Sequence, residues 1–272
     1  PQHVEAVFGE EFVLDPPAPD LQLAPVKRVA IIAEAFLPKV DGVSKSAMLA
    51  LQYLQQTGRE VLVFAPDTSP EQIFGTRVIP LPSFGFPKVP ETRVALPSAI
   101  IARELETFQP DLIHLFSPAL MSYSGIVAGR RMRVPVVANY QTDLPGFAQL
   151  YGWDFAVGPT WRWMRYVHNR CHLTLVPSKH SERELRDHHF KRLRPGARGV
   201  AHKRFDPAKR SQEWRERLLN GRDPHSLICV YVGRVATEKS IELLLDVANL
   251  PGVALTIIGD GAAREDLEQV FA

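Results

Sequence analysis

From Lys27 onward, short apolar strands alternate with amphipathic stretches, and this alternation constrains the fold more than any other feature of the chain. Strands and helices in this order build βα units around a parallel sheet. The alternation stops at a basic segment containing Pro and Gly, residues 192–207, and then begins again. The sequence therefore predicts an α/β protein with two Rossmann-like domains, each with a parallel sheet.

The pattern divides the chain into an irregular N-terminal extension (1–26), a first domain (27–198) and a second domain (199–272). About 70 residues are too few for a doubly wound sheet, which usually takes ~100–150 residues, so we expect the second domain to be truncated. We expect strands at 28–33, 60–65, 76–79, 112–115, 134–139, 173–177, 227–232 and 253–258. We expect helices at 44–56, 97–107, 122–131, 160–170, 179–188, 240–250 and from 262 onward.

Charge is distributed unevenly along the chain. Residues 1–26 hold five acidic side chains and no Lys or Arg, whereas residues 162–222 hold 17 Lys and Arg against six Asp and Glu. Such a basic stretch suits either an anionic ligand or membrane surface, or a solvated helical face. No run approaches the ~20 apolar residues that cross a bilayer. We expect a cytoplasmic protein that contacts the inner face of the cell membrane peripherally.

Two glycine loops follow strands and precede helices. Gly42 and Val43 lie after the first strand, where free N–H groups of a helix start can face an anion. Gly259 and Gly261 follow the last strand. Neither loop carries a complete Gly-x-Gly-x-x-Gly fingerprint, so each also fits a simple turn.

Two further loops carry polar groups at predicted carboxyl ends of strands, where α/β sheets bind ligands. Gly233, Arg234 and Lys239 share one loop, and its two cations can clamp a diphosphate, with Glu238 orienting either one. The other loop holds Tyr140, Gln141, Thr142 and Asp143. Asp143 can accept hydrogen bonds from sugar hydroxyls, and Gln141 or Thr142 can present amide or hydroxyl groups, although turn chemistry also explains Asp143.

Metal and hydrolase chemistry receive less support. His168, Cys171 and His172 have spacing compatible with zinc, but their helix is aromatic and amphipathic, so we interpret the two histidines as packing or edge residues. The chain has no nucleophile elbow, no His-Glu-x-x-His and no Walker loop. Cys171 and Cys229 are predicted to be small core residues.

In this order, the motifs resemble glycosyltransferase family 4, over residues 27 to 272. The segments that carry the resemblance are the Gly42 loop, 140–147, 176–178, 198–200, 204–207, 233–239 and 259–261. Within the family, the chain is most similar to bacterial GDP-mannose-dependent α-mannosyltransferases acting on lipids, with sulfoquinovosyl and glucosyl transferases of diacylglycerol as near neighbours.

The resemblance implies the GT-B fold, with the acceptor bound mostly by the first domain and the nucleotide sugar by the second. It implies metal-independent transfer of a hexose, with retention, to a diacylglycerol- or phosphatidylinositol-type lipid. Gly42, Val43, Gly233, Gly259 and Gly261 would bind the donor. Arg234 and Lys239 would neutralise its diphosphate, Asp143 would lie beside the reacting groups, and Tyr140, Gln141, Thr142 and Asp143 would bind the acceptor.

The chain also departs from the family pattern. Gln141 stands where many members have His, and Ala201 stands where a Gly-Val-Asp motif places its acid. The acidic Glu-x7-Glu segment of the family would lie beyond Ala272, so we expect weak or no catalysis from these 272 residues alone.

Three other functions stay open: UDP-sugar-dependent transfer to lipid, a GT-B sugar-nucleotide epimerase or hydrolase, and a non-catalytic module that binds anionic lipid or sugar. No nucleic-acid recognition motif accompanies the basic stretch, so we expect no nucleic-acid partner.

Overall fold

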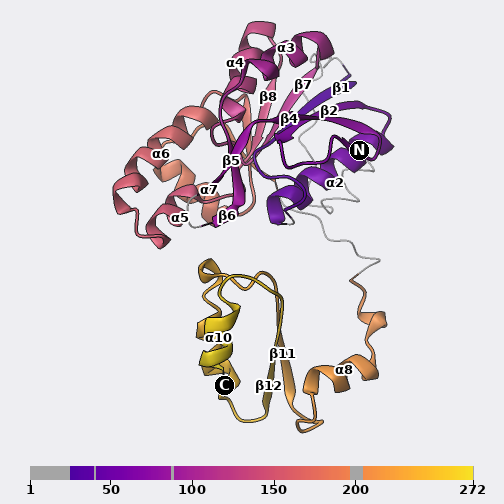
Figure 1. Ribbon diagram of the computed structural model, residues 1–272, viewed down its shortest axis with the longest axis vertical. Coiled ribbons are helices and arrows are strands. Elements are labelled where there is room, and N and C mark those ends of the chain that lie inside the picture. Colours follow the sequence, from indigo (N-terminus) through magenta and orange to yellow (C-terminus); the bar gives the residue numbers. More distant parts are fainter. Residues whose placement is uncertain (1–24, 40, 87–88, 197–204, 272) are drawn as a thin grey trace. The chain divides into compact units, whose positions relative to one another are not determined.

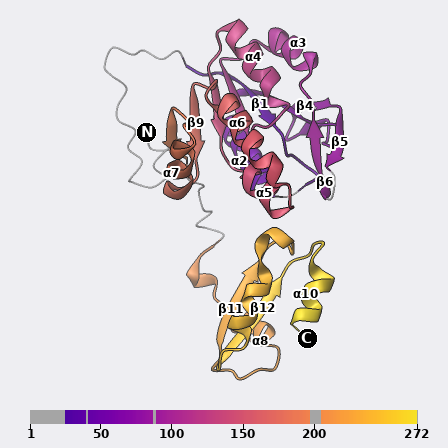
Figure 2. The same ribbon diagram turned by 90° about the vertical axis from the view of Figure 1, so that its left-hand side faces the viewer.

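The computed structural model (Figure 1, Figure 2) describes residues 25–39, 41–86, 89–196 and 205–271, and the side chains of 86–91 lie outside this description. Most of the predicted N-terminal extension therefore lies outside the described residues. The chain separates into two compact units, with the division between Gly199 and Val200. The ligand-binding roles assigned to the two units stay predictions.

An eight-stranded sheet forms the centre of the first unit. Its strands are β1 (Arg28–Ala33), β2 (Glu60–Pro66), β3 (Gln72–Ile73), β4 (Thr76–Leu81), β7 (Leu112–Phe116), β8 (Val136–Asn139), β9 (Leu173–Val176) and β10 (Leu193–Pro195). Their order is β10-β9-β8-β7-β1-β2-β4-β3, and all neighbours are parallel except β3 and β4. A separate antiparallel hairpin pairs β5 (Ser83–Phe86) with β6 (Val89–Ala95).

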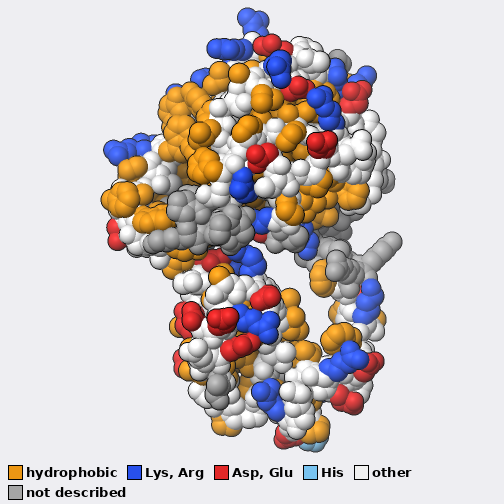
Figure 3. Space-filling model, viewed as in Figure 1, with side chains coloured by type: hydrophobic (Ala, Val, Ile, Leu, Met, Phe, Trp, Pro, Cys, Tyr) orange, Lys and Arg blue, Asp and Glu red, His pale blue; other side chains and the backbone are white. Residues whose placement is uncertain are grey.

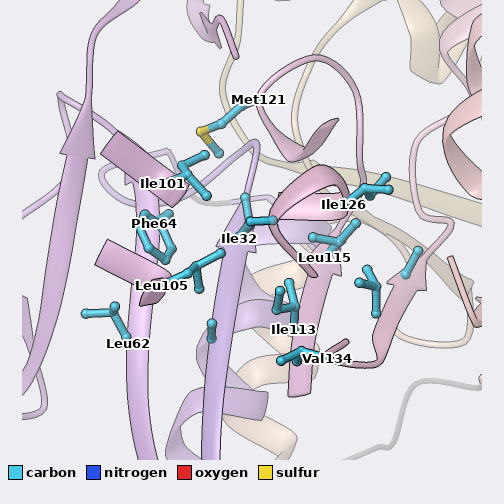
Figure 4. Close-up of a cluster of buried hydrophobic side chains, with 14 of the residues drawn as sticks. Ile32, Leu62, Phe64, Ile101, Leu105, Ile113, Leu115, Met121, Ile126 and Val134 are labelled. Carbon is cyan, nitrogen blue, oxygen red and sulfur yellow. The ribbon is translucent and has the colours of Figure 1, made fainter. Parts of the chain in front are cut away.

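Helices cover both faces of this sheet. They are α2 (Gly42–Gln56), α3 (Ala99–Phe108), α4 (Ser122–Met132), α5 (Leu144–Leu150), α6 (Asp154–His168) and α7 (Lys179–Asp187). Successive side chains of β1 point to opposite faces. Ile32 packs with residues of α3 and α4 (Figure 4), whereas Ile31 packs with residues of α2. Each such buried side chain contributes about 1.5–3 kcal/mol.

Close packing of α4 on the sheet depends on a glycine. A Cβ on Gly125 would lie 2.2 Å from Cδ1 of Ile32, and the next atoms it would meet belong to Leu115 and Ile113. A larger residue at this position would require the end of the buried Ile32 side chain to shift.

The chain changes direction across the sheet between β1 and β7. From β1 it proceeds outward through β2 and β4, and it then returns to β7 on the other side of β1 and proceeds through β8, β9 and β10. Loops that leave the carboxyl ends of strands at such a switch point diverge and leave room for a ligand. Glu34 and Ser117 directly follow the two strands at this point.

The second unit is a smaller α/β body. Its elements are α8 (Gln212–Leu219), β11 (Leu227–Val232), α9 (Leu245–Ala248), β12 (Val253–Ile258) and α10 (Arg264–Val270), with short 3₁₀ turns at Pro207–Lys209, Thr237–Lys239 and Ile241–Leu244. β11 and β12 are parallel and in register over six residues. Several of their apolar side chains are exposed, including Val232 at 72% and Leu227 at 66%.

The predicted strands at 28–33, 227–232 and 253–258 are confirmed at both ends. The helix predicted over 240–250 is confirmed in part: Ser240 has φ 45° and precedes a 3₁₀ turn at Ile241–Leu244, and Leu245–Ala248 is α-helical. The start predicted at Thr160 is wrong, because α6 begins at Asp154 and contains Pro159. Packing of α6 along α5 outweighs the backbone hydrogen bond lost at that proline.

No helix among the described residues has the length and apolarity needed to span a membrane.

Candidate functional site

Glu34 is the most unusual side chain at the carboxyl edge of the first sheet. Its Oε1 accepts hydrogen bonds from the backbone N–H groups of Ala119 (2.9 Å) and Ser122 (2.8 Å), at the start of α4. Burial raises the pKa of this carboxyl, against the opposing effect of those hydrogen bonds. The N-cap residue of α4, Met121, offers no side-chain cap, so Glu34 supplies one from a distant strand.

The glycine loop after β1 is arranged differently from the prediction. α2 begins at Gly42, and Asp41 is its N-cap: one carboxylate oxygen accepts from the N–H groups of Val43 and Ser44, both at 2.9 Å. The Ser44 hydroxyl accepts from the Asp41 N–H and completes a capping box. The Val43 N–H that was expected to face an anionic group of a ligand thus donates to the Asp41 carboxylate, and a donor contact by Val43 stays a prediction. A donor contact by Gly42 stays a prediction.

Tyr140, at the end of β8, is a core residue. Its side chain is 4% exposed and packs with Met164, Val176 and Leu185. Burial raises the pKa of its hydroxyl, with a further contribution from Asp143. The predicted acceptor contact through this side chain is therefore not supported, since the ring points into the protein.

The next three residues stay at the sheet edge. The Oε1 atom of Gln141 is buried and has no hydrogen-bond partner among the described residues. Thr142 lies 2.5 Å, hydroxyl to hydroxyl, from Ser117, which follows β7. Asp143 is exposed and caps α5, accepting from the Gly146 N–H at 3.0 Å. The turn interpretation of Asp143 is confirmed, and contacts of Gln141, Thr142 and Asp143 with an acceptor stay predictions.

A cleft of about 430 Å³ opens beside Glu34, between the ends of β1 and β2 and strand β6. Its polar side chains include Lys39 and Arg93, neither of which the sequence analysis selected. The lining residues are Glu34, Ala35, Phe36, Pro38, Lys39, Pro66, Thr68, Thr92 and Arg93.

The two predicted donor loops of the second unit interlock through their backbones. The Gly233 N–H donates to the Ile258 carbonyl (3.1 Å), and the Val235 N–H donates to the Asp260 carbonyl (2.9 Å). A Cβ on Gly261 would lie 2.2 Å from the carbonyl oxygen of Val235. Gly233, Gly259 and Gly261 are thus brought together, and contact between the two loops already accounts for glycine at 259 and 261. Donor contacts by all three stay predictions.

Glu238 orients Arg234. The guanidinium Nη2 lies 2.5 Å from the Glu238 carboxylate, whose side chain is only 12% exposed. Lys239 is exposed, and no acidic side chain within the described residues forms an ion pair with it. One cation of the loop is thus held in place and the other is available, but a diphosphate clamp stays a prediction.

His168, Cys171 and His172 have separate structural partners. His168 is buried, and its Nδ1 lies 3.0 Å from the Thr174 hydroxyl. His172 Nδ1 accepts from the Val136 N–H at 3.0 Å. Burial raises the pKa of the Cys171 thiol to about 12. The packing interpretation of these residues is confirmed. Cys229, by contrast, is only half-buried.

This sequence of βα units and loops can be compared with that of known protein families. The model of Glycosyltransferase Family 4 matches residues 40–204. The chain belongs to glycosyltransferase family 4. Residues 198–200 and 204, which also suggested this family, lie outside the described residues.

Curated members of the family are similar over most of the chain. The GDP-mannose-dependent alpha-mannosyltransferase of Mycobacterium tuberculosis is 42% identical over 90% of the chain, and that of Corynebacterium glutamicum is 37% identical over 90%. The sulfoquinovosyl transferase SQD2 of Arabidopsis thaliana is 36% identical over 96% of the chain. The chain spans 65%, 60% and 53% of the lengths of these three proteins, respectively.

Solved structures share the fold at low sequence identity. Sucrose-phosphate synthase from Thermosynechococcus elongatus has a TM-score of 0.63 at 18% identity, covering 90% of this chain and 68% of its own. HepE from Anabaena has a TM-score of 0.61 at 15% identity, covering 90% and 65%. This family member therefore has the GT-B fold.

Proposed function

We propose that the protein transfers mannose from GDP-mannose to a lipid acceptor of the diacylglycerol or phosphatidylinositol type. The observation that carries the proposal is the 37–42% identity, over 90% of the chain, to three proteins named GDP-mannose-dependent alpha-mannosyltransferase. A UDP-sugar-dependent transfer is the second candidate, because SQD2 is 36% identical over 96% of the chain.

The proposed reaction breaks the bond from the anomeric carbon to the diphosphate and forms a bond from that carbon to the acceptor oxygen. The proton of the acceptor hydroxyl passes to the leaving diphosphate on the same face, which gives retention without a metal ion. Arg234, oriented by Glu238, and Lys239 stabilise the charge that develops on the diphosphate.

Parallel incubations of the full-length protein with GDP-mannose, UDP-glucose and UDP-sulfoquinovose, each with diacylglycerol or phosphatidylinositol, test the donor and the acceptor. We expect a mannolipid, detected by mass spectrometry, only with GDP-mannose. The anomeric configuration of the product, from proton NMR, tests retention. Addition of EDTA tests metal independence. Consumption of the donor at equal rates with and without lipid would instead indicate a hydrolase or epimerase.

The proposal includes a peripheral contact with an anionic membrane. Figure 3 shows hydrophobic side chains gathered on the face of the first unit that carries α6, with Lys and Arg side chains beside them. Near the start of α6, Phe155 is 83% exposed and Leu150 is 46% exposed. Arg130, Arg131 and Arg133 are exposed at the end of α4. Each such cation near an anionic surface contributes about 1 kcal/mol to binding.

A further inference from the structure

Glu34 holds the start of α4 with a single carboxylate oxygen. Both hydrogen bonds, from Ala119 and from Ser122, end on Oε1. The same side chain lines the cleft at the ends of β1 and β2. No hydrogen bond from the described part of the chain ends on Oε2, so this oxygen can meet a molecule in that cleft, and a carboxylate oxygen is a strong acceptor for a hydroxyl donor.

The position of Glu34 also points to a ligand. It directly follows β1, the strand at which the chain reverses direction across the sheet, and ligands of open α/β sheets bind outside the carboxyl ends of strands at that point. Glu34 has no role in the proposed neutralisation of the diphosphate by Arg234 and Lys239.

The cations of the cleft are already neutralised. Lys39 lies 3.6 Å from the Asp41 carboxylate and donates to the Thr92 hydroxyl at 2.8 Å. Arg93 lies 3.4 Å from Asp67 and donates to the Ser83 hydroxyl at 3.0 Å. Among the described lining residues, each of the two cations thus has an acidic partner, which leaves no excess positive charge for an anion.

What remains suits a neutral polyhydroxyl group. Thr68 and Thr92 add hydroxyls that both donate and accept, as do the hydroxyls of a sugar or glycerol. Phe36, Pro38 and Pro66 provide apolar surface for the C–H groups of such a molecule. The volume of about 430 Å³ lies within the range of small-molecule sites, about 300–1,000 Å³.

We infer that this cleft binds the neutral sugar or glycerol headgroup of the acceptor, and that Glu34 is a positioning residue that accepts a hydrogen bond from one of its hydroxyls. The inference rests on the proposed function for the identity of the ligand as an acceptor. It names a subsite separate from the segment 140–143 that the sequence analysis selected.

The decisive variant is Glu34→Gln. Its amide oxygen can still accept from Ala119 and Ser122, while its NH₂ group replaces the acceptor Oε2 by a donor. We therefore expect thermal stability close to wild type and a loss of headgroup affinity of about tenfold or more. Glu104→Gln is the matched control, because Glu104 is a partly buried carboxylate of α3 that pairs with Arg77 away from the cleft.

Binding is measured by NMR with α-glucosylglycerol as the neutral probe and glycerol phosphate as the anionic one, without a nucleotide sugar. We expect the neutral probe to shift the amide resonances of Ala119 and Ser122 in wild type and Glu104→Gln, with about tenfold weaker binding by Glu34→Gln. Tighter binding of glycerol phosphate than of glucosylglycerol would overturn the inference. Equal affinity of wild type and Glu34→Gln for glucosylglycerol would overturn it as well.

Kinetics separate this inference from the proposed function. In a protein that forms glycolipid, we expect Glu34→Gln to raise the acceptor KM about tenfold or more and to leave the donor KM unchanged. An unchanged acceptor KM would overturn the inference while the transferase function stands. If no donor yields glycolipid but the NMR result holds, the transferase function fails and the cleft remains a polyhydroxyl site.

Discussion

A Cβ atom on Gly259 would lie 1.8 Å from the carbonyl oxygen of Gly233. The loop after β12 thus touches the loop after β11 through bare backbone, directly before Arg234 in the chain. Close contact between the two loops therefore requires glycine at position 259, independently of any contact with a nucleotide.

We expect Gly259→Ala to destabilise the second unit by several kcal/mol, since the added methyl group forces the two loops apart. Gly252→Ala is the control in the same unit: it has φ +71° but nothing within 4 Å of its Cβ, so only about 1–2 kcal/mol should be lost. Hydrogen exchange of the β11 and β12 amides measures the loss of stability in both variants. Equal protection in the two variants would contradict the steric argument.

Glu238→Gln should weaken GDP binding without unfolding the protein. The ion pair at 2.5 Å holds Arg234, and its loss frees the guanidinium to sample positions away from a diphosphate. We expect Kd for GDP to rise about tenfold by calorimetry, and further for Arg234→Gln. Arg217→Gln is the control, since it removes only an exposed pair with Glu213 on α8. If Arg217→Gln weakens GDP binding as much as Glu238→Gln does, the orientation of Arg234 is not the cause.

The buried His168 makes stability depend on pH. Burial lowers its pKa to about 3 in the folded protein, whereas the unfolded chain takes up a proton near the ordinary value of 6.5. The contribution of His168 to stability is therefore present above pH 6.5 and is lost as pH falls toward 3. The free energy of unfolding falls by at most about 1.4 kcal/mol per pH unit, because unfolding takes up at most one proton at this side chain.

Urea titrations between pH 7 and pH 4.5 test this dependence. His168→Phe should show a flatter decline of the unfolding free energy with falling pH than wild type does. Thr174→Val removes the hydrogen bond between Thr174 and His168 but keeps the imidazole. It should therefore retain the wild-type dependence of the unfolding free energy on pH. Parallel slopes for all three proteins would assign the acid sensitivity to other groups.

Phe155→Ser should reduce recovery with anionic vesicles in a flotation assay, because an 83% exposed ring at the start of α6 can enter the lipid interface. Phe74→Ser is the matched control, with a ring 59% exposed in the turn between β3 and β4. Binding by wild type should weaken with salt. Equal recovery with neutral and anionic vesicles at every salt concentration would exclude the electrostatic part of the contact.

Some loops were predictable and others were not. Gly233, Arg234 and Glu238 follow an apolar strand directly, so their place at the sheet edge followed from order along the chain. The sequence analysis did not identify Asp41 as the cap of α2, although Asp is among the preferred N-cap residues. Glu34 had a signal as well, since a carboxylate directly after the apolar strand 28–33 is conspicuous.

By itself, the sequence determined the α/β class, the restart of the βα pattern and the family, because apolar periodicity and ordered motifs are local properties of a chain. Only the tertiary structure decided which side chains meet. Glu34 finds its partners at Ala119 and Ser122, more than 80 residues away, and Tyr140 turns into the core and leaves the site. Such pairings depend on strand order and on the packing of helices against the sheet, which no short-range pattern encodes.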